Sequence, residues 1–257
     1  MNRLVKNFKN KKEDEKTLIC YFPVGDPSFD SLHIAGLYLE GGVDVLEIGI
    51  PVSNPYLDGK LVADSMERAL SVRTPLECIE IIVDIRKKYP EAVLQAMCYK
   101  QLFDTLDWDT FNKYVVRCEL DGLLVADANL EEQLEIRSKL HPNVSLLSFL
   151  PFNYSDADVA YLQKHGEGYV FLQAVDGVTG MRDSLDERLY DKIKEAKEAL
   201  KDVPVCAGFG ISKPEHCRQV YDMGADGVII GSAVLRKIQE GDESLVSFIK
   251  ECKKALR

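Results

Sequence analysis

At positions 46–59 the chain reads Leu46-Glu47-Ile48-Gly49-Ile50-Pro51-Val52-Ser53-Asn54-Pro55-Tyr56-Leu57-Asp58-Gly59. The apolar residues from Val43 to Ile50 predict a largely buried strand. A glutamate inside such a strand is costly unless it is paired, hydrogen-bonded or needed for chemistry. Glu47 is therefore a candidate functional residue. The following loop supplies a second acid, Asp58, and we expect both carboxyl groups to point toward one site.

Short apolar runs alternate with amphipathic helical stretches along the chain. The runs are Leu18–Phe22, Val43–Ile48, Val93–Met97, Gly122–Val125, Val144–Leu150, Tyr169–Gln173, Val203–Ala207 and Gly227–Ile230. Strands that are buried on both faces have this near-continuous apolar pattern, and helices between them imply parallel crossovers. Eight such units predict an α/β fold of the (β/α)8 (TIM) barrel type. We expect a single domain over residues 1–257, with its active site at the carboxyl ends of the strands.

A doubly wound open sheet is the alternative fold. A dinucleotide-binding sheet of that type carries G-x-G-x-x-G after its first strand, whereas this chain has only Val24-Gly25-Asp26-Pro27 at that place. The missing fingerprint favours the barrel.

Composition narrows the class of protein. The 257 residues are 46% hydrophobic, which suffices for a large core, and the net charge of −10 argues against binding nucleic acid. The basic run from Lys6 to Lys12 is interpreted as the solvated end of a short helix. No apolar stretch is long enough to span a membrane, and the charged N-terminal segment does not resemble a signal peptide.

The seven cysteines are widely spaced, without a C-x-x-C pair, so the sequence indicates neither a disulfide framework nor a zinc site. Reduced thiols fit a cytoplasmic protein. The histidines suggest no metal triad, because His33 and His165 fall in predicted helices, His141 precedes a strand and His216 begins a helix. Proton transfer is therefore assigned to carboxyl groups, which can work near neutral pH if burial raises a pKa.

The sequence predicts helix starts at three places. Ser155-Asp156-Ala157-Asp158 opens a helix that runs to His165, and Lys213-Pro214-Glu215 has proline at a first helical position. The helix after Asp58 begins somewhere from Lys60 to Ala63.

Two glycine-rich segments follow the last two strands, at Ala207–Ser212 and Ile230–Ala233. Small residues let backbone N–H groups close on an anion, and a helix N-terminus adds partial positive charge. Glycine is also common in ordinary turns, but loops seven and eight are the usual phosphate site of a barrel. We expect a phosphorylated small-molecule substrate.

The loop from Asp176 to Asp183 has two glycines around Thr179 and could close over a ligand, although an ordinary mobile connection would look the same. A pocket for an aromatic group is predicted from strand-end residues. They are Tyr21, Met97, Tyr99, Leu124, Phe149 and Phe171. Each of these residues could equally belong to the barrel core. Glu47 could be a structural acid bound to backbone amides. The sequence Leu57–Lys60 is also typical of an ordinary turn.

Taken together, the motifs resemble the tryptophan synthase alpha subunit family over essentially the whole chain. They are Val24-Gly25-Asp26-Pro27, Leu46–Pro51 with Asp58-Gly59, Leu124-Val125-Ala126-Asp127, Gly177-Val178-Thr179-Gly180, Gly208-Phe209-Gly210-Ile211-Ser212 and Gly231-Ser232.

The resemblance implies cleavage of indole-3-glycerol phosphate to indole and glyceraldehyde 3-phosphate, a carbon–carbon lyase reaction of tryptophan biosynthesis. Glu47 would be the general acid and base, and Asp58 would accept a hydrogen bond from the indole nitrogen. Gly180, Gly210, Gly231 and Ser232 would hold the phosphate, and Thr179 would anchor the closing loop. The remaining substrate-binding residues are expected to be Tyr21, Tyr99, Leu124, Phe149, Phe171 and Phe209. No metal is expected.

The resemblance also implies a partner, the beta subunit, in an alpha2-beta2 heterotetramer. Pyridoxal phosphate would belong to that subunit, and this chain would hold no cofactor. Several positions depart from the family pattern in loops that contact the partner in the family. They are Asn54, Lys60, Lys100-Gln101, Ala128-Asn129 and Ala174-Val175-Asp176.

Two other functions remain open at this stage. One is a catalytically weakened subunit that mainly binds and activates a beta subunit, which the presence of both Glu47 and Asp58 argues against. The other is a barrel enzyme that acts on a different phosphorylated substrate, which the glycine loops alone would permit.

Overall fold

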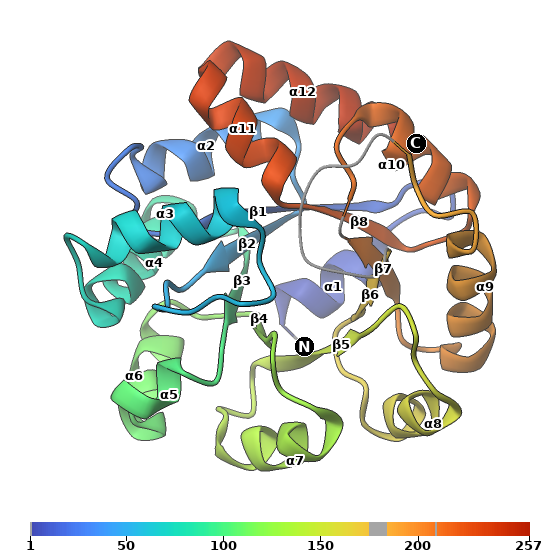
Figure 1. Ribbon diagram of the computed structural model, residues 1–257, viewed down its shortest axis with the longest axis horizontal. Coiled ribbons are helices and arrows are strands. Elements are labelled where there is room, and N and C mark those ends of the chain that lie inside the picture. The colour runs from blue at the N-terminus through green and yellow to red at the C-terminus, as the bar shows by residue number, and fades with distance from the viewer. Residues whose placement is uncertain (1, 175–183, 209) are drawn as a thin grey trace.

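The computed structural model describes residues 2–174, 184–208 and 210–257 and shows a closed barrel of parallel strands in the order β1 to β8, with β8 paired to β1. The strands are β1 Thr17–Pro23, β2 Val45–Gly49, β3 Val93–Cys98, β4 Gly122–Val125, β5 Ser145–Leu150, β6 Val170–Gln173, β7 Val205–Gly208 and β8 Gly227–Ile230. Figure 1 shows these strands at the centre, ringed by helices. The predicted (β/α)8 barrel is confirmed, and closure excludes the open sheet.

Helices follow the strands as predicted. They are α1 Arg3–Asn10, α2 Ser31–Gly41, α3 Lys60–Leu70, α4 Pro75–Lys88, α5 Leu102–Thr105, α6 Trp108–Arg117, α7 Leu130–Lys139, α8 Asp156–His165, α9 Leu189–Leu200, α10 Pro214–Asp222, α11 Ser232–Glu240 and α12 Asp242–Ala255. Ser155 and Asp158 form a reciprocal capping box at α8. Pro214 opens α10, where no intrahelical donor is lost, and α3 begins at Lys60.

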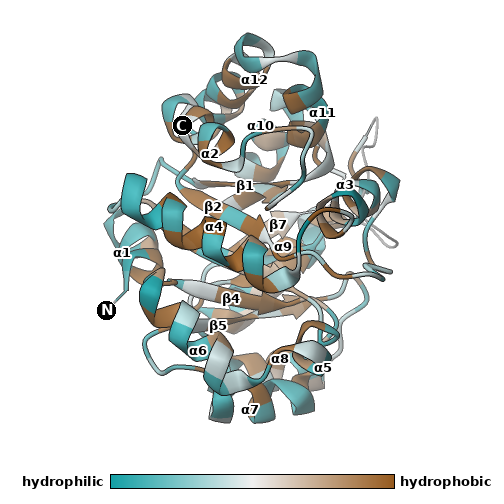
Figure 2. Ribbon diagram, turned by 90° about the vertical axis from the view of Figure 1, so that its left-hand side faces the viewer, coloured by the Kyte–Doolittle hydropathy of each residue, from teal (hydrophilic) through white to brown (hydrophobic). Residues whose placement is uncertain are grey.

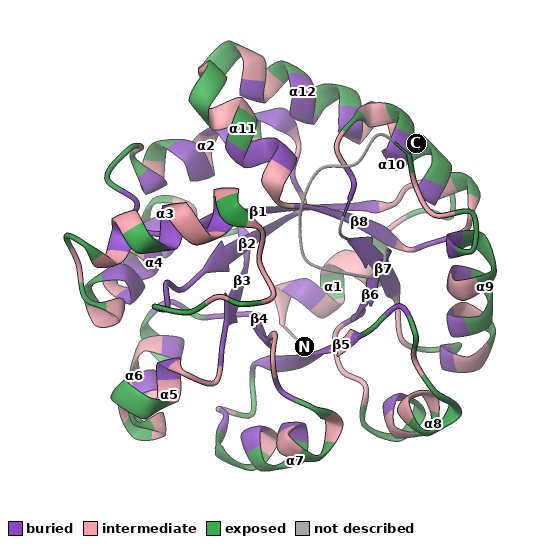
Figure 3. Cartoon of the chain, viewed as in Figure 1, coloured by how far each residue is buried: buried purple, intermediate pink, exposed green. Residues whose placement is uncertain are grey.

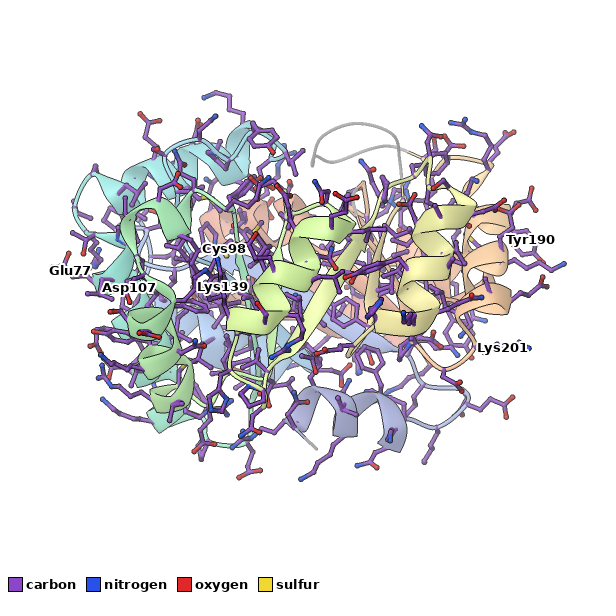
Figure 4. The ribbon with its side chains drawn as sticks, turned by 90° about the horizontal axis from the view of Figure 1, so that it is seen from below. Glu77, Cys98, Asp107, Lys139, Tyr190 and Lys201 are labelled. Carbon is purple, nitrogen blue, oxygen red and sulfur yellow. The ribbon has the colours of Figure 1, made fainter. Side chains whose placement is uncertain are left out.

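The core lies in two layers. The strands are buried almost throughout, and each helix turns an apolar face toward them, as the purple inner surfaces in Figure 3 show. Polar side chains cover the outside; Figure 4 shows Glu77 and Tyr190 at the outer rim. All seven cysteines are free and buried. Within the described ranges, no helix is long and apolar enough to cross a membrane.

Helix α1 covers one end of the barrel. In Figures 2 and 4 it lies across the end from which the strand arrows point away. Leu4 is fully buried there, and the Asn2 side chain donates to the backbone oxygen of Asp121 over 2.7 Å. The ring of Phe8 packs against that of Tyr169, with centroids 5.6 Å apart. Because this end is closed, a ligand can enter the barrel only at the carboxyl ends of the strands.

The same end carries a repeated electrostatic clamp. An acid shortly before each even-numbered strand accepts a backbone N–H of the preceding odd-numbered strand and pairs with a cation. The second strand begins at Val45, directly after its acid, and not at Val43 as predicted. Asp44 accepts the N–H of Leu18 and pairs with Lys11, and Asp121 accepts the N–H of Leu94 and pairs with Arg86. In the same way Glu167 binds Leu146 and Arg137, and Asp226 binds Val205 and Lys197. The clamps hold neighbouring strands in register.

The clamp at Asp121 is the most buried one, and it allows a stability test. Replacing Asp121 by Ala leaves the buried Arg86 guanidinium without its counter-charge, which costs about 3–5 kcal/mol of unfolding free energy. Glu135→Ala is the matched control, because Glu135 pairs with Lys139 on the exposed face of α7 and contributes about 0.5 kcal/mol. Urea unfolding of both variants checks this prediction. Equal midpoints would contradict it.

Candidate active site

A pocket opens at the carboxyl ends of the strands. Its walls come from Tyr21, Glu47, Leu57, Asp58, Val62, Met97, Tyr99, Leu124, Ala126, Phe149, Phe171, Gly210, Ile211, Ile229, Gly231 and Ser232. The pocket therefore contains both acids and the predicted apolar strand-end residues. It also contains the glycines predicted after β7 and β8.

Three predicted site residues, Thr179, Gly180 and Phe209, lie outside the described residues. The same holds for most of the predicted closing loop. All the other predicted site residues line the pocket.

Glu47 lies on β2 with its side chain inside the barrel and 3% exposed. Burial, together with the nearby charge of Asp58, raises its pKa to about 8. One carboxyl oxygen accepts a hydrogen bond from Nε2 of Gln95 at 2.7 Å, which acts in the opposite direction by favouring the charged form. At neutral pH Glu47 is therefore mainly protonated and can give up a proton.

Asp58 lies in the loop between β2 and α3 and reaches the same pocket. Its carboxylate accepts a hydrogen bond from the Tyr99 hydroxyl at 2.7 Å, and its backbone N–H donates to the oxygen of Pro55. Burial and the Asp58 charge raise the pKa of Tyr99, so that residue stays neutral and keeps donating. A residue directly after β3 thus positions the loop acid.

Tyr21 lies on β1 beside Glu47, its register partner on β2. Its hydroxyl group is buried and has no hydrogen-bond partner among the described residues. Gly49 makes room for this phenol, since a Cβ at that position would lie 2.1 Å from the hydroxyl oxygen. Burial raises the pKa of Tyr21, so a neutral hydroxyl group faces the pocket.

The remaining wall is apolar. The rings of Phe149 and Phe171 lie 5.5 Å apart at 43°, and Met97, Leu124 and Ile229 complete this side. A flat aromatic ring can be enclosed here with little exposure to water.

The opposite side can hold an anion. Helix α11 begins at Ser232, directly after Gly231, so the positive end of its dipole faces the pocket. Gly210 has a φ of +77°, a left-handed conformation that glycine adopts without strain. The pocket therefore combines an acid pair, an aromatic site and an anion site.

The loops near Asp58 are linked to one another. The backbone N–H of Asn54 donates to the Gln101 side chain, and that of Lys100 donates to Asp127 at 2.8 Å. Tyr56 packs its ring against Tyr99. Two further departures from the family pattern are local: Asn129 caps α7, and Lys60 pairs with Asp64 on the exposed face of α3. Each of these residues therefore makes a contact within this chain.

The sequence analysis missed some of the site. Leu57, Val62, Ile211 and Ile229 line the pocket but were not predicted. Because alternate residues of a strand share a face, Ile229, two positions before Gly231, could have been predicted. Predicting Val62 would have required the exact start of α3. Gln95 was also missed, although it is a polar residue inside an apolar strand run.

The four histidines lie outside the pocket walls. Within the part of the chain that the structure describes, no cluster of three or more His, Cys, Asp and Glu side chains could hold a metal ion. The polar side chains in the pocket walls are the carboxyl groups of Glu47 and Asp58 and the hydroxyl groups of Tyr21, Tyr99 and Ser232.

The chain is similar in sequence to known proteins. The family model described as "Tryptophan synthase alpha chain" matches residues 8–256. The tryptophan synthase alpha chain of Sodalis glossinidius is 34% identical over 95% of this chain and 94% of the relative. That of Clostridium beijerinckii is 28% identical over the full length of both.

Solved structures agree as well. The tryptophan synthase alpha chain of Legionella pneumophila superposes with a TM-score of 0.87 at 25% identity and covers 100% of this chain and 97% of that one. A chain from Aquifex aeolicus VF5 gives 0.90 at 29% identity over the full length of both. By fold and by sequence, the chain belongs to the tryptophan synthase alpha chain family.

Proposed function

We propose that Glu47 and Asp58 carry out the lyase reaction of this family, the cleavage of indole-3-glycerol phosphate to indole and glyceraldehyde 3-phosphate. The observation that carries the proposal is the buried carboxyl group of Glu47, protonated at neutral pH, facing a pocket that also holds Asp58. The site belongs to one barrel domain that spans residues 1–257.

The first step is proton transfer. The Glu47 carboxyl group gives its proton to C3 of the indole ring, which places positive charge on the ring nitrogen. Asp58 accepts a hydrogen bond from the ring N–H and stabilises this charge. The Tyr99 hydroxyl keeps the Asp58 carboxylate in place during this step.

The second step breaks the carbon–carbon bond. The Glu47 carboxylate removes the proton of the glycerol hydroxyl next to the ring, a carbonyl forms at that carbon, and the electron pair of the broken bond returns to the ring. The products are indole and the aldehyde. Because Glu47 gives one proton and regains one, the enzyme returns to its starting state.

The rest of the pocket matches the rest of the substrate. The apolar wall with Phe149 and Phe171 suits the indole ring. Gly210, Gly231 and Ser232 would hold the phosphate at the start of α11. We include Thr179, Gly180 and Phe209 in the site on the family pattern alone.

The proposal extends to the partner. An alpha chain of tryptophan synthase works beside a beta subunit, and we propose an alpha2-beta2 complex in the cytoplasm. Pyridoxal phosphate would be bound by the beta subunit. The pairing of both acids in one pocket supports a lyase over a subunit that only activates its partner.

Removing either acid tests the mechanism. Glu47→Gln and Asp58→Asn keep the side-chain shape but remove the proton-transfer group or the charge, and each should lower kcat about 100-fold to 10,000-fold. Indole release from indole-3-glycerol phosphate is the measurement. Asp64→Asn is the control, because Asp64 is a charged residue of α3 outside the pocket. Near-normal activity of Glu47→Gln would show that the mechanism is wrong even if the wild type cleaves this substrate.

The pH dependence gives a second test. Glu47 must be protonated in the free enzyme, and with a pKa of about 8 it is protonated below that pH. We therefore expect the basic limb of kcat/KM to have its midpoint near pH 8, with a tenfold fall per unit above it. Activity that stays constant to pH 10 would contradict the assignment of Glu47 as the acid.

The altered loops give a third test. Because Asn54, Gln101 and Asn129 are engaged within this chain, we expect a beta subunit adapted to them. The beta subunit of the same organism should raise indole formation about 10-fold more than that of Sodalis glossinidius. Equal activation by the two would contradict this co-adaptation.

A further inference from the structure

Gln95 has an unusual position for a side chain that is not in contact with the pocket. It lies on β3, in register with Glu47 on β2, and both side chains point into the barrel. Gln95 is fully buried. A buried amide is costly unless its donors and acceptor are satisfied, whereas a leucine would need no partner here.

The amide is held from both sides. Its Nε2 donates to Glu47 at 2.7 Å, and its Oε1 accepts from the Tyr169 hydroxyl at 2.8 Å. Tyr169 is also fully buried, precedes β6 and is packed against Phe8 of α1. A chain of hydrogen bonds therefore crosses the barrel interior from Tyr169 to Glu47.

The direction of this chain matters for Glu47. With Oε1 occupied by the Tyr169 hydroxyl, the amide presents its N–H side to the carboxyl group. This orientation stabilises the ionised carboxylate. If the amide turned over, its oxygen would face Glu47 and would disfavour the ionised form.

We propose that Gln95 is a positioning residue for Glu47, and that the Tyr169 hydroxyl sets the orientation of the Gln95 amide so that the carboxylate left after proton transfer is held in place. This inference rests on the proposed function, in which Glu47 must act as a base after it has acted as an acid.

Other titratable groups lie within electrostatic range of Glu47. They are Asp58 in the loop after β2, Cys20 and Tyr21 on β1, Tyr169 before β6 and Cys206 on β7. Burial raises the pKa of each of these tyrosines and cysteines, so they stay neutral near pH 7. Besides burial, which raises the pKa of Glu47, Asp58 and Gln95 are therefore the groups that affect its charge state, and they act in opposite directions.

The test uses Gln95→Leu and Tyr169→Phe. Loss of the hydrogen bond to the carboxylate should move the basic limb of kcat/KM upward by about 1 pH unit in Gln95→Leu. We expect kcat to fall about 10-fold with KM within twofold, because Gln95 does not line the pocket. Tyr169→Phe should shift the limb in the same direction by a smaller amount. Since it removes a single oxygen atom, it keeps the test valid if Gln95→Leu does not fold.

A matched control and a double variant separate positioning from packing. Gln133→Leu also breaks a buried hydrogen bond between a glutamine and a hydroxyl group, that of Ser148, but lies on α7 away from Glu47. It should leave the pH midpoint unchanged. If Tyr169 acts through Gln95, the Gln95→Leu/Tyr169→Phe variant should have the same pH midpoint as Gln95→Leu.

The outcomes distinguish this inference from the proposed function. If the wild type with its beta subunit does not release indole, the proposed function fails. If the wild type is active and Glu47→Gln is not, but Gln95→Leu and Tyr169→Phe keep the wild-type pH midpoint and kcat, only the present inference is overturned. A shift in Gln133→Leu equal to that in Gln95→Leu would also overturn it.

Discussion

The chemistry of this protein depends on keeping water away from one carboxyl group. Because the barrel is closed and α1 covers its far end, Glu47 is buried among apolar side chains. A carboxyl group accessible to solvent would keep a pKa near the ordinary value. Burial instead raises the pKa of Glu47 to about 8, which makes a carboxylic acid available at neutral pH. Closure of the barrel therefore creates the acid.

Acidic residues have different roles at the two ends of the barrel. At the closed end, Asp44 and Asp121 meet lysine or arginine side chains and backbone N–H groups, so their charges are compensated and they hold strands together. At the open end, Glu47 accepts from an amide and Asp58 from a phenol. Neutral donors position an acid without fixing its charge. The partner of each acid thus decides whether it stabilises the fold or takes part in proton transfer.

Much of this architecture could be predicted from the sequence, because buried parallel strands and capped helices leave local patterns. The eight strands were found, and the second was predicted to begin at Val43, two residues before its observed start at Val45. The contribution of Val62 to the pocket depends on how α3 packs, which no local pattern encodes. The link from Tyr169 to Gln95 is likewise beyond local patterns, since it joins residues 74 positions apart across the barrel.

The departures from the family pattern lie where the physics permits change. Glu47 is fixed by its strand, and any movement along β2 would break the register with β1 and β3. Asn54 and Gln101 belong to surface loops, and the hydrogen bond between them joins the two loops without involving a strand. Substitution in these loops can therefore alter how the chain meets a partner while the geometry of the acids stays the same. Glu47 and these loops therefore belong to separable parts of the fold, because the loops can change while the strand that carries Glu47 keeps its register.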